Sequence, residues 1–311
     1  MNRRLALRLA GAGAALAVVG GGAVALTGED SPDPPTSTAT VTPSPSVEGP
    51  DEPTVLVTKI VFLINENRGY NQVRKGAPKM KAFGDKFGQA TNVYAWGHPS
   101  LPNYVVMGAG SNRGITSNSH HKVTGPTLLT KVWAAGKSLY VFGQSMSTDN
   151  CRMGQRGYYH ERHIWPTQFV DERALCEKYV VGYDKILPRI DNGTLGNVNM
   201  IVPNNCKNSH DCSLSGSDTW NATEVERLMA GPDYKSGKLV IVGTWDEDNK
   251  AEGNHIHMYV IHPSLENKVV TTRLTHYSIH KTMAEFGGVP AMTTKGKDAT
   301  SITTAFGLPV A

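Results

Sequence analysis

Apolar and polar positions follow two different patterns along the chain from Val55 onward. Short runs rich in β-branched residues predict strands, whereas apolar residues spaced three and four positions apart predict helices. The predicted strands span Leu56–Ile64, Ala90–Tyr94, Ser138–Phe142, Asn197–Val202, Leu239–Gly243 and His257–Ile261. The predicted helices span Pro78–Phe87, Leu101–Gly108, Thr127–Ala135, Asp184–Asp191, Thr223–Ala230 and Tyr277–Phe286.

Strands and helices take turns along this stretch, and no internal repeat interrupts the pattern. Such alternation predicts an α/β fold, in which helices cover both faces of a mostly parallel central sheet to give a three-layer α/β/α sandwich. In sheets of this kind the ligand site lies beyond the carboxyl ends of the strands. The residues that follow the predicted strands are therefore the first candidates for chemistry.

The beginning of the chain has a different composition. Arg3 and Arg4 precede an apolar run rich in alanine and glycine, and Ala23-Val24-Ala25 offers a cleavage site with small residues. This pattern predicts a signal peptide and an extracytoplasmic protein, with retention of the segment as a membrane anchor as the alternative. The next stretch is rich in Pro, Ser, Thr and acidic residues, which predicts a solvated linker. The predicted parts are a signal peptide at 1–25, a linker at 26–54 and a globular domain at 55–311.

The formal net charge of +4 comes largely from the predicted signal peptide. Residues 1–25 hold three of the 31 basic residues and none of the 27 acidic ones, so 28 basic and 27 acidic residues remain. A nearly neutral chain without a basic stripe argues against nucleic acid as a binding partner. Contact with a membrane is expected only through the N-terminal segment or a lipid substrate.

Four cysteines, at positions 151, 176, 206 and 212, all lie in the exported part of the chain. An even number of cysteines in an oxidising compartment predicts two disulfides. Of the three possible connectivities, we expect the two local pairs, Cys151 with Cys176 and Cys206 with Cys212. A zinc site is the weaker alternative, because the sequence has no CxxC pair.

Two predicted strands end in oxygen-rich segments. The first strand continues into Glu66 and Asn67, and the strand at Leu239–Gly243 is soon followed by Asp246 and Glu247. Each segment alone also fits a polar turn. Adjacent acids after a buried strand repel one another unless a cation or solvent relieves them, and two such ends in one parallel sheet favour a metal site.

Ser100 lies between these segments in the sequence, in the motif HPSLPNY, and an apolar helical stretch follows it. Pro102 suits the first turn of a helix, which places Ser100 at the helix N-terminus. Serine is a common N-cap, so a purely structural role explains it locally. The same position favours anions through free N–H groups and the helix dipole, and Asn103 is expected to face the same anion.

The motifs ENR, HPSLPNY and TWDED occur in this order and are followed by NHI and THYS. Together they resemble the phosphoesterase family that contains secreted phospholipases C and acid phosphatases, within the alkaline-phosphatase-like superfamily. The resemblance covers about residues 58–290, and SLPNY also resembles the nucleophile segment of nucleotide pyrophosphatases. It implies an alkaline-phosphatase-like sandwich that hydrolyses a phosphate ester, either a small phosphomonoester or a phospholipid.

The family's roles map onto matching positions. Ser100 is the implied nucleophile, which would form a phosphoserine intermediate that water then cleaves. The implied ligands of a divalent metal are Glu66, Asn67, Asp246 and Glu247. Because all four offer oxygen, Mg, Mn or Ca is favoured over Zn.

Histidines form a second group of candidates, since the chain has 11 of them. His210 and His276 match the family pattern and are expected to position substrate oxygens or to protonate the leaving group. The match is incomplete around them. Asn208-Ser209 replaces an Asn-Asp pair of the family, and the residues after His163 depart from a family Arg-His-Asn-Pro segment.

Two other functions remain as alternatives. These departures leave room for a catalytically inactive, exported binding protein on the same fold. A metal-independent serine esterase is the second alternative, but its GxSxG motif is absent, because the segment Gly143 to Ser147 lacks the final glycine.

Overall fold

An eight-stranded sheet forms the centre of the protein, in the order β11-β2-β10-β9-β1-β8-β4-β7. A computed structural model describes residues 55–146, 151 and 154–311, so the predicted signal peptide at 1–25 and linker at 26–54 lie outside the described residues. Strand β10 is antiparallel to both of its neighbours, and the other paired strands are parallel. In sheet order the strands are Lys268–Val270, Gly88–Ala90, Met258–Ile261, Leu239–Trp245, Lys59–Asn65, Val198–Val202, Leu139–Gly143 and Val180–Gly182.

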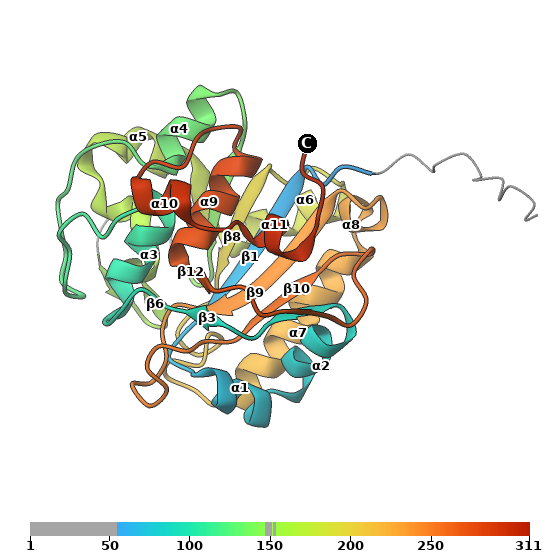
Figure 1. Ribbon diagram of the computed structural model, residues 1–311. Helices are drawn as coiled ribbons and strands as arrows, with labels where there is room; N and C mark the ends of the chain where they lie inside the picture. Colours follow the sequence, from blue (N-terminus) through green and yellow to red (C-terminus); the bar gives the residue numbers. More distant parts are fainter. Residues whose placement is uncertain (1–54, 147–150, 152–153) are drawn as a thin grey trace, which may run out of the picture. The chain divides into compact units, whose positions relative to one another are not determined.

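Helices lie on both sides of this sheet, with α1, α2 and α7 on one side and α3, α9, α10 and α11 on the other (Figure 1). The α-helices α1 to α11 are Tyr70–Gly76, Pro78–Lys86, Ser100–Ala109, Leu128–Ala134, Arg173–Tyr179, Leu187–Asp191, Leu214–Ala230, Pro232–Lys235, His276–Phe286, Thr294–Asp298 and Ile302–Phe306. The 3-10 helices η1 to η4 are Glu161–His163, Trp165–Gln168, Val170–Glu172 and Tyr183–Lys185. Two small sheets pair β12 (Leu274–Thr275) with β3 (Val93–Tyr94), and β5 (Gln155–Arg156) with β6 (Tyr159–His160). The predicted α/β/α sandwich is confirmed.

Strands β1 and β9 form the middle of the core. Every residue of β9 is buried, as are six of the seven residues of β1. Near-continuous apolar runs of this kind are expected when helices cover both faces of a parallel sheet. The two strands pair in register from Lys59 opposite Leu239 to Asn65 opposite Trp245. Because they end side by side, the residues that follow them emerge at one edge of the sheet.

Most of the predicted elements are present with ends that differ by up to three residues, and three of them differ more. The predicted strand at Ala90–Tyr94 is divided between β2 of the large sheet and β3 of a small one. The predicted helix at Asp184–Asp191 consists of η4 and α6. Helix α7 begins at Leu214 rather than at Thr223, because Ser213 caps it by accepting a hydrogen bond from the Gly216 N–H. Its first half contains weak helix formers that the helix pattern alone did not favour.

Both expected disulfides are present, Cys151–Cys176 and Cys206–Cys212. Each joins cysteines close in sequence, at separations of 25 and 6 residues. Disulfides persist in oxidising compartments, so they support an extracytoplasmic location. No helix within the described residues is long and apolar enough to cross a membrane.

Candidate active site

The carboxyl ends of β1 and β9 bring Glu66, Asn67, Asp246 and Glu247 together, which are the four residues expected to hold a metal. The Asp246 N–H donates to the Asn65 carbonyl at 2.9 Å, which continues the β1–β9 pairing past the end of the strands. The Asn67 N–H donates to Asp246 Oδ1 at 3.3 Å. Asn67 has a φ of 58°, a left-handed conformation that asparagine tolerates better than most residues.

Ser100 is the first residue of α3 and points into these carboxylates. Its Oγ donates to Glu66 Oε2 at 3.1 Å and lies 3.3 Å from Glu247 Oε1. Asn103 is one turn further along α3 and donates from Nδ2 to Glu247 Oε2 at 3.1 Å. The same nitrogen lies 2.8 Å from the Gly97 carbonyl, so Asn103 also holds the loop that leads to Ser100. The expected nucleophile and its helical neighbour therefore contact the expected ligands. We refer to Glu66, Asp246 and Glu247 as the acid cluster.

The acid cluster is buried, and its charge is poorly solvated. Glu66 and Asp246 have no exposed surface, and Glu247 is 5 % exposed. Burial raises the pKa of Glu66 to about 8 and that of Glu247 to about 9. Burial and the nearby charge of Glu66 raise the pKa of Asp246 well above its usual range. Three buried carboxylates this close together cannot all carry a negative charge unless a cation neutralises them, and otherwise some of them must be protonated.

The donor set of the acid cluster fits a hard divalent cation. Asp246 Oδ2 is buried without a hydrogen-bond partner among the described residues. Such an oxygen is costly unless something else satisfies it. Within the described residues, no three His, Cys, Asp or Glu side chains already adopt the arrangement of a complete metal site. Glu66 and Glu247 instead contact Ser100 and Asn103, so a bound cation would require side chains of the acid cluster to rotate.

His163 connects the acid cluster to a group of histidines. Its Nε2 lies 3.2 Å from Glu66 Oε1, and its ring stacks on Tyr104, whose hydroxyl donates to the same oxygen at 2.7 Å. The rings of His160 and His210 lie 5.9 and 6.2 Å from that of His163. His210 therefore belongs to the group of histidines around His163, which is the member that contacts Glu66. Its expected role, to position substrate oxygens or to protonate the leaving group, stays a prediction.

His276 occupies a different setting at the start of α9. It is fully buried, and its ring nitrogens lie 3.3 Å from the Trp245 carbonyl and 3.4 Å from the Trp96 N–H. Burial lowers its pKa to about 4. With both nitrogens facing the backbone, His276 is placed to support the chain next to Asp246. Its expected role, to position substrate oxygens or to protonate the leaving group, stays a prediction.

Several residues of this site were not singled out in the sequence. His98 lies 3.1 Å from Glu247 Oε2 through Nδ1 and 2.9 Å from Asp248 Oδ1 through Nε2. Asp248 is fully buried and accepts N–H groups of the following loop, including that of Lys250 at 2.8 Å. Both residues belong to the quoted motifs HPSLPNY and TWDED, and that membership was the available signal. Tyr104, the last residue of HPSLPNY, was also overlooked.

The buried pair Asn208-Ser209 forms hydrogen bonds with the backbone of Glu66. The Glu66 N–H donates to the Asn208 carbonyl at 2.9 Å, and Ser209 Oγ donates to the Glu66 carbonyl at 2.8 Å. This pair departs from the family pattern recognised in the sequence, yet here it fixes the backbone of Glu66.

Comparison with known proteins shows which family the chain belongs to. The sequence profile of the phosphoesterase family matches residues 74–290, which is more than half of the chain. The chain belongs to the phosphoesterase family. It is accordingly a hydrolase that acts on phosphoric ester bonds. Ser100, Asp246 and Glu247 of this phosphoesterase lie inside the matched residues, whereas Glu66 and Asn67 precede them.

Curated relatives of the phosphoesterase include phosphatases. It is 24 % identical over 235 residues to a phosphatidylinositol-3-phosphatase of Mycobacterium tuberculosis, an alignment that covers 74 % of this chain and 77 % of the relative. It is 20 % identical to a phosphate-repressible acid phosphatase of Penicillium chrysogenum, over 65 % of this chain and 52 % of the relative. The phosphoesterase therefore spans about half the length of that fungal relative.

Solved structures support the fold. A protein in the alkaline phosphatase superfamily from Vibrio parahaemolyticus superposes with a TM-score of 0.53 at 11 % identity, over 79 % of this chain and 70 % of that one. The lipoteichoic acid synthase LtaP from Listeria monocytogenes superposes with a TM-score of 0.55 at 8 % identity, over 78 % and 76 % of the two chains. At such identities the comparison concerns the fold alone, which is alkaline-phosphatase-like, as expected.

Proposed function

We propose that this phosphoesterase is a metal-dependent phosphatase that removes phosphate from a phosphomonoester through a phosphoserine on Ser100. The single observation that carries the proposal is the position of Ser100 Oγ, 3.1 Å from Glu66 and 3.3 Å from Glu247. A nucleophile held against buried carboxylates at the N-terminus of a ten-residue helix can meet both a cation and a phosphate.

In the proposed reaction Ser100 Oγ gives its proton to a water molecule and attacks phosphorus in line, while the bond from phosphorus to the leaving oxygen breaks. His210 is the proposed donor of a proton to that oxygen, because its side chain is 28 % exposed beside the histidine group. Water then cleaves the phosphoserine and restores the hydroxyl. The helix dipole at the start of α3 favours the negative charge on the equatorial phosphate oxygens. The Leu101 N–H takes no part in this, because it donates to Asn118 Oδ1 at 2.9 Å.

Glu66, Asn67, Asp246 and Glu247 are the proposed ligands of a divalent cation. A cation held there supplies positive charge that favours the Ser100 alkoxide and neutralises a phosphate oxygen. The all-oxygen donor set supports Mg, Mn or Ca over Zn. Burial of the three carboxylates, which raises the pKa of each, supports a bound cation as their partner.

The substrate class rests on the relatives. The names of the mycobacterial and fungal relatives describe phosphatases, one of them acting on a phosphoinositide and the other on substrates at acid pH. They support a phosphomonoester as the substrate, either soluble or carried by a lipid headgroup. A phospholipase C-like attack on a phosphodiester is the second possibility within the same site chemistry.

The test compares hydrolysis of p-nitrophenyl phosphate and of its bis-ester by the full chain, the Ser100→Ala variant and the Ser145→Ala variant. We expect Ser100→Ala to reduce kcat by at least about a thousandfold, because the nucleophile is lost. Ser145 belongs to the segment that most nearly matches a GxSxG elbow, and it accepts a hydrogen bond from Asn204 at 2.9 Å. Ser145→Ala should retain activity.

Metal dependence is tested on the same protein. Treatment with EDTA should abolish turnover, and Mg²⁺, Mn²⁺ or Ca²⁺ should restore it. Turnover that survives both EDTA and Ser100→Ala would contradict the proposal. Hydrolysis of p-nitrophenyl acetate that resists EDTA and is lost in Ser145→Ala would instead identify a serine esterase. Phosphonate binding without any turnover would identify an inactive binding protein.

A further inference from the structure

A cavity of about 440 Å³ lies over β4 and β7, at one edge of the large sheet. Ligand pockets in proteins commonly measure about 300–1,000 Å³. Three of its eight lining residues are cationic, and none is acidic. In the sheet it is separated from β1 by β8, and none of its lining residues belongs to the acid cluster or to α3. Its polar lining consists of Tyr140, Lys178, Lys185, Arg189, Asn192 and Thr194.

The floor of the cavity is aromatic and closely packed. The Tyr140 ring lies edge-on to Trp133 and to Tyr179, with centroids 5.6 and 5.8 Å away. The Arg189 guanidinium lies over the Tyr140 ring at 4.2 Å from its centroid. Stacking of this kind fixes the plane of the guanidinium and leaves N–H groups at its edge, which suit the oxygens of a phosphate. A prepositioned guanidinium loses less conformational entropy when an anion binds.

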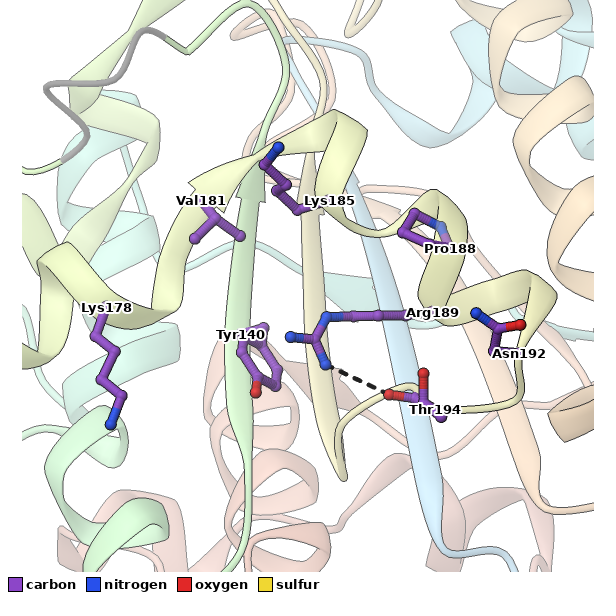
Figure 2. Close-up of a pocket in the computed structure, with 8 residues that line it drawn as sticks. All are labelled: Tyr140, Lys178, Val181, Lys185, Pro188, Arg189, Asn192 and Thr194. Carbon is purple, nitrogen blue, oxygen red and sulfur yellow. Dashed lines mark hydrogen bonds between the residues drawn. The ribbon is translucent and has the colours of Figure 1, made fainter.

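Further donors surround this guanidinium. Lys178 lies across the Tyr140 ring from Arg189, and Lys185 lies near the upper end of the cavity (Figure 2). Lys178 is exposed, whereas Lys185 pairs with Asp184 at 2.9 Å and therefore contributes less net charge. Asn192 and Thr194 add an amide and a hydroxyl to the lining. The cavity thus presents hydrogen-bond donors and positive charge together.

We propose that this cavity is a second, non-catalytic binding site for a phosphate-bearing anion. Lys178 and Arg189 have no carboxylate beside them in the cavity lining, and an anion bound there would balance their charge. Arg189 matches a phosphate through paired N–H groups and Lys178 acts as a point charge. The volume exceeds what one phosphate needs, so the ligand carries a further group, as in a phospholipid headgroup or a soluble phosphorylated compound. This site does not depend on the function proposed for Ser100.

The soluble form of the ligand is tested with phenylphosphonate, whose carbon–phosphorus bond a phosphoesterase does not cleave. Calorimetric titration of the full chain should reveal one binding site more than titration of the Lys178→Gln/Arg189→Gln variant. Lys178→Gln alone should weaken the cavity site at least about tenfold, because one charge-assisted contact is lost. Lys178 is exposed, so this single substitution leaves the fold intact even if removal of Arg189 disturbs Tyr140.

The matched control is Lys235→Gln/Lys268→Gln, which removes two exposed lysines, one of them on β11 at the opposite edge of the sheet. It should bind phenylphosphonate as the wild type does. Hydrolysis of p-nitrophenyl phosphate should be equal in all these proteins, since none of the substitutions touches the acid cluster.

Vesicles distinguish the source of the phosphate. Phosphatidylcholine vesicles with and without phosphatidylglycerol are sedimented with each protein. If the lipid headgroup is the ligand, the cavity variants should lose binding to the anionic vesicles at least about tenfold relative to the control. If a soluble compound is the ligand, only phenylphosphonate binding should fall. Equal phenylphosphonate binding and equal vesicle binding in wild-type, cavity-variant and control proteins would overturn the proposal.

Discussion

Three side chains surround the Glu66 carboxylate: Ser100 at 3.1 Å, Tyr104 at 2.7 Å and His163 at 3.2 Å. At the scale of single residues, these contacts hold the buried Glu66 side chain in place. Burial raises the pKa of Glu66 to about 8, although the hydrogen bonds from Tyr104 and Ser100 act in the opposite direction. The same contacts fix the rotamer of Glu66, so the nucleophile and the expected metal ligand are oriented together.

His98 is the residue whose loss should be most informative at this scale. Its two nitrogens contact Glu247 and Asp248 at 3.1 and 2.9 Å. We expect His98→Ala to lower kcat/KM by about 10–100-fold, because a support of an expected ligand disappears. The measurement is steady-state hydrolysis of p-nitrophenyl phosphate with the divalent metal titrated. The loss should be partly recovered at high metal concentration if His98 acts by orienting Glu247.

His120→Ala provides the control for that experiment. His120 also contacts a carboxylate, that of Glu161 at 2.9 Å, but it is half exposed and does not contact the acid cluster. Its replacement should leave kcat/KM within about twofold, in line with the small worth of an exposed ion pair. Equal losses in both variants would contradict a specific role for His98.

At the scale of elements, the pairing of β1 with β9 decides where the site is. Their register places Asn65 opposite Trp245, so the segments that carry Glu66 and Asp246 begin at the same level. Helix α7 fixes this edge from the other side. Asn221 of α7 and Asn65 exchange side-chain hydrogen bonds of 2.9 and 3.2 Å, and both residues are fully buried.

Replacement of Asn221 by alanine should therefore affect both stability and turnover. It removes the two shortest hydrogen bonds of the buried Asn65 amide and leaves, among the described residues, only those to the Thr244 carbonyl and from Ser217 Oγ, both of 3.4 Å, which should lower the free energy of unfolding by about 1–3 kcal/mol. Because Glu66 follows Asn65 directly, kcat should also fall. Urea unfolding and p-nitrophenyl phosphate hydrolysis measure the two effects. Thr223→Ala, on an exposed position of the same helix, should change neither. An unaltered unfolding curve for Asn221→Ala would refute this account.

At the scale of the whole molecule, buried histidines make stability depend on pH. His257 and His280 are fully buried, and burial lowers their pKa values to about 3 and about 4. An unfolded histidine has a pKa of about 6.5. Below that value the unfolded chain binds protons that the folded chain does not. The contribution of these histidines to stability is therefore complete above about pH 6.5 and falls as the pH drops toward 4.

His257 allows this to be measured, because neither of its ring nitrogens has a hydrogen-bond partner among the described residues. The free energy of unfolding is compared by urea titration at about pH 7.5 and about pH 5. In the His257→Met variant the decrease between these pH values should be smaller than in the wild type by about 2 kcal/mol. His120→Gln, which replaces a half-exposed histidine, should retain the wild-type decrease. An identical decrease in all three proteins would rule out His257 as a source.

The sequence by itself determined the features that depend on neighbours along the chain. The strands β1 and β9 are recognisable as continuous apolar runs, because a strand covered on both faces has no polar side. The oxygen-rich segments after them, Ser100 at a helix start and two disulfides between nearby cysteines are equally local. Ordered motifs then identified the family from the same residues.

Only the tertiary structure decided which local features meet. The sequence does not state that β9 lies next to β1, since pairing between strands about 180 residues apart depends on the whole sheet. For the same reason the contact of His163 with Glu66 was not predicted from the sequence. The start of α7 was missed because its polar residues are stabilised by distant partners such as Asn65. The local sequence pattern therefore indicated which residues form the site, and long-range packing determined how they are arranged in space.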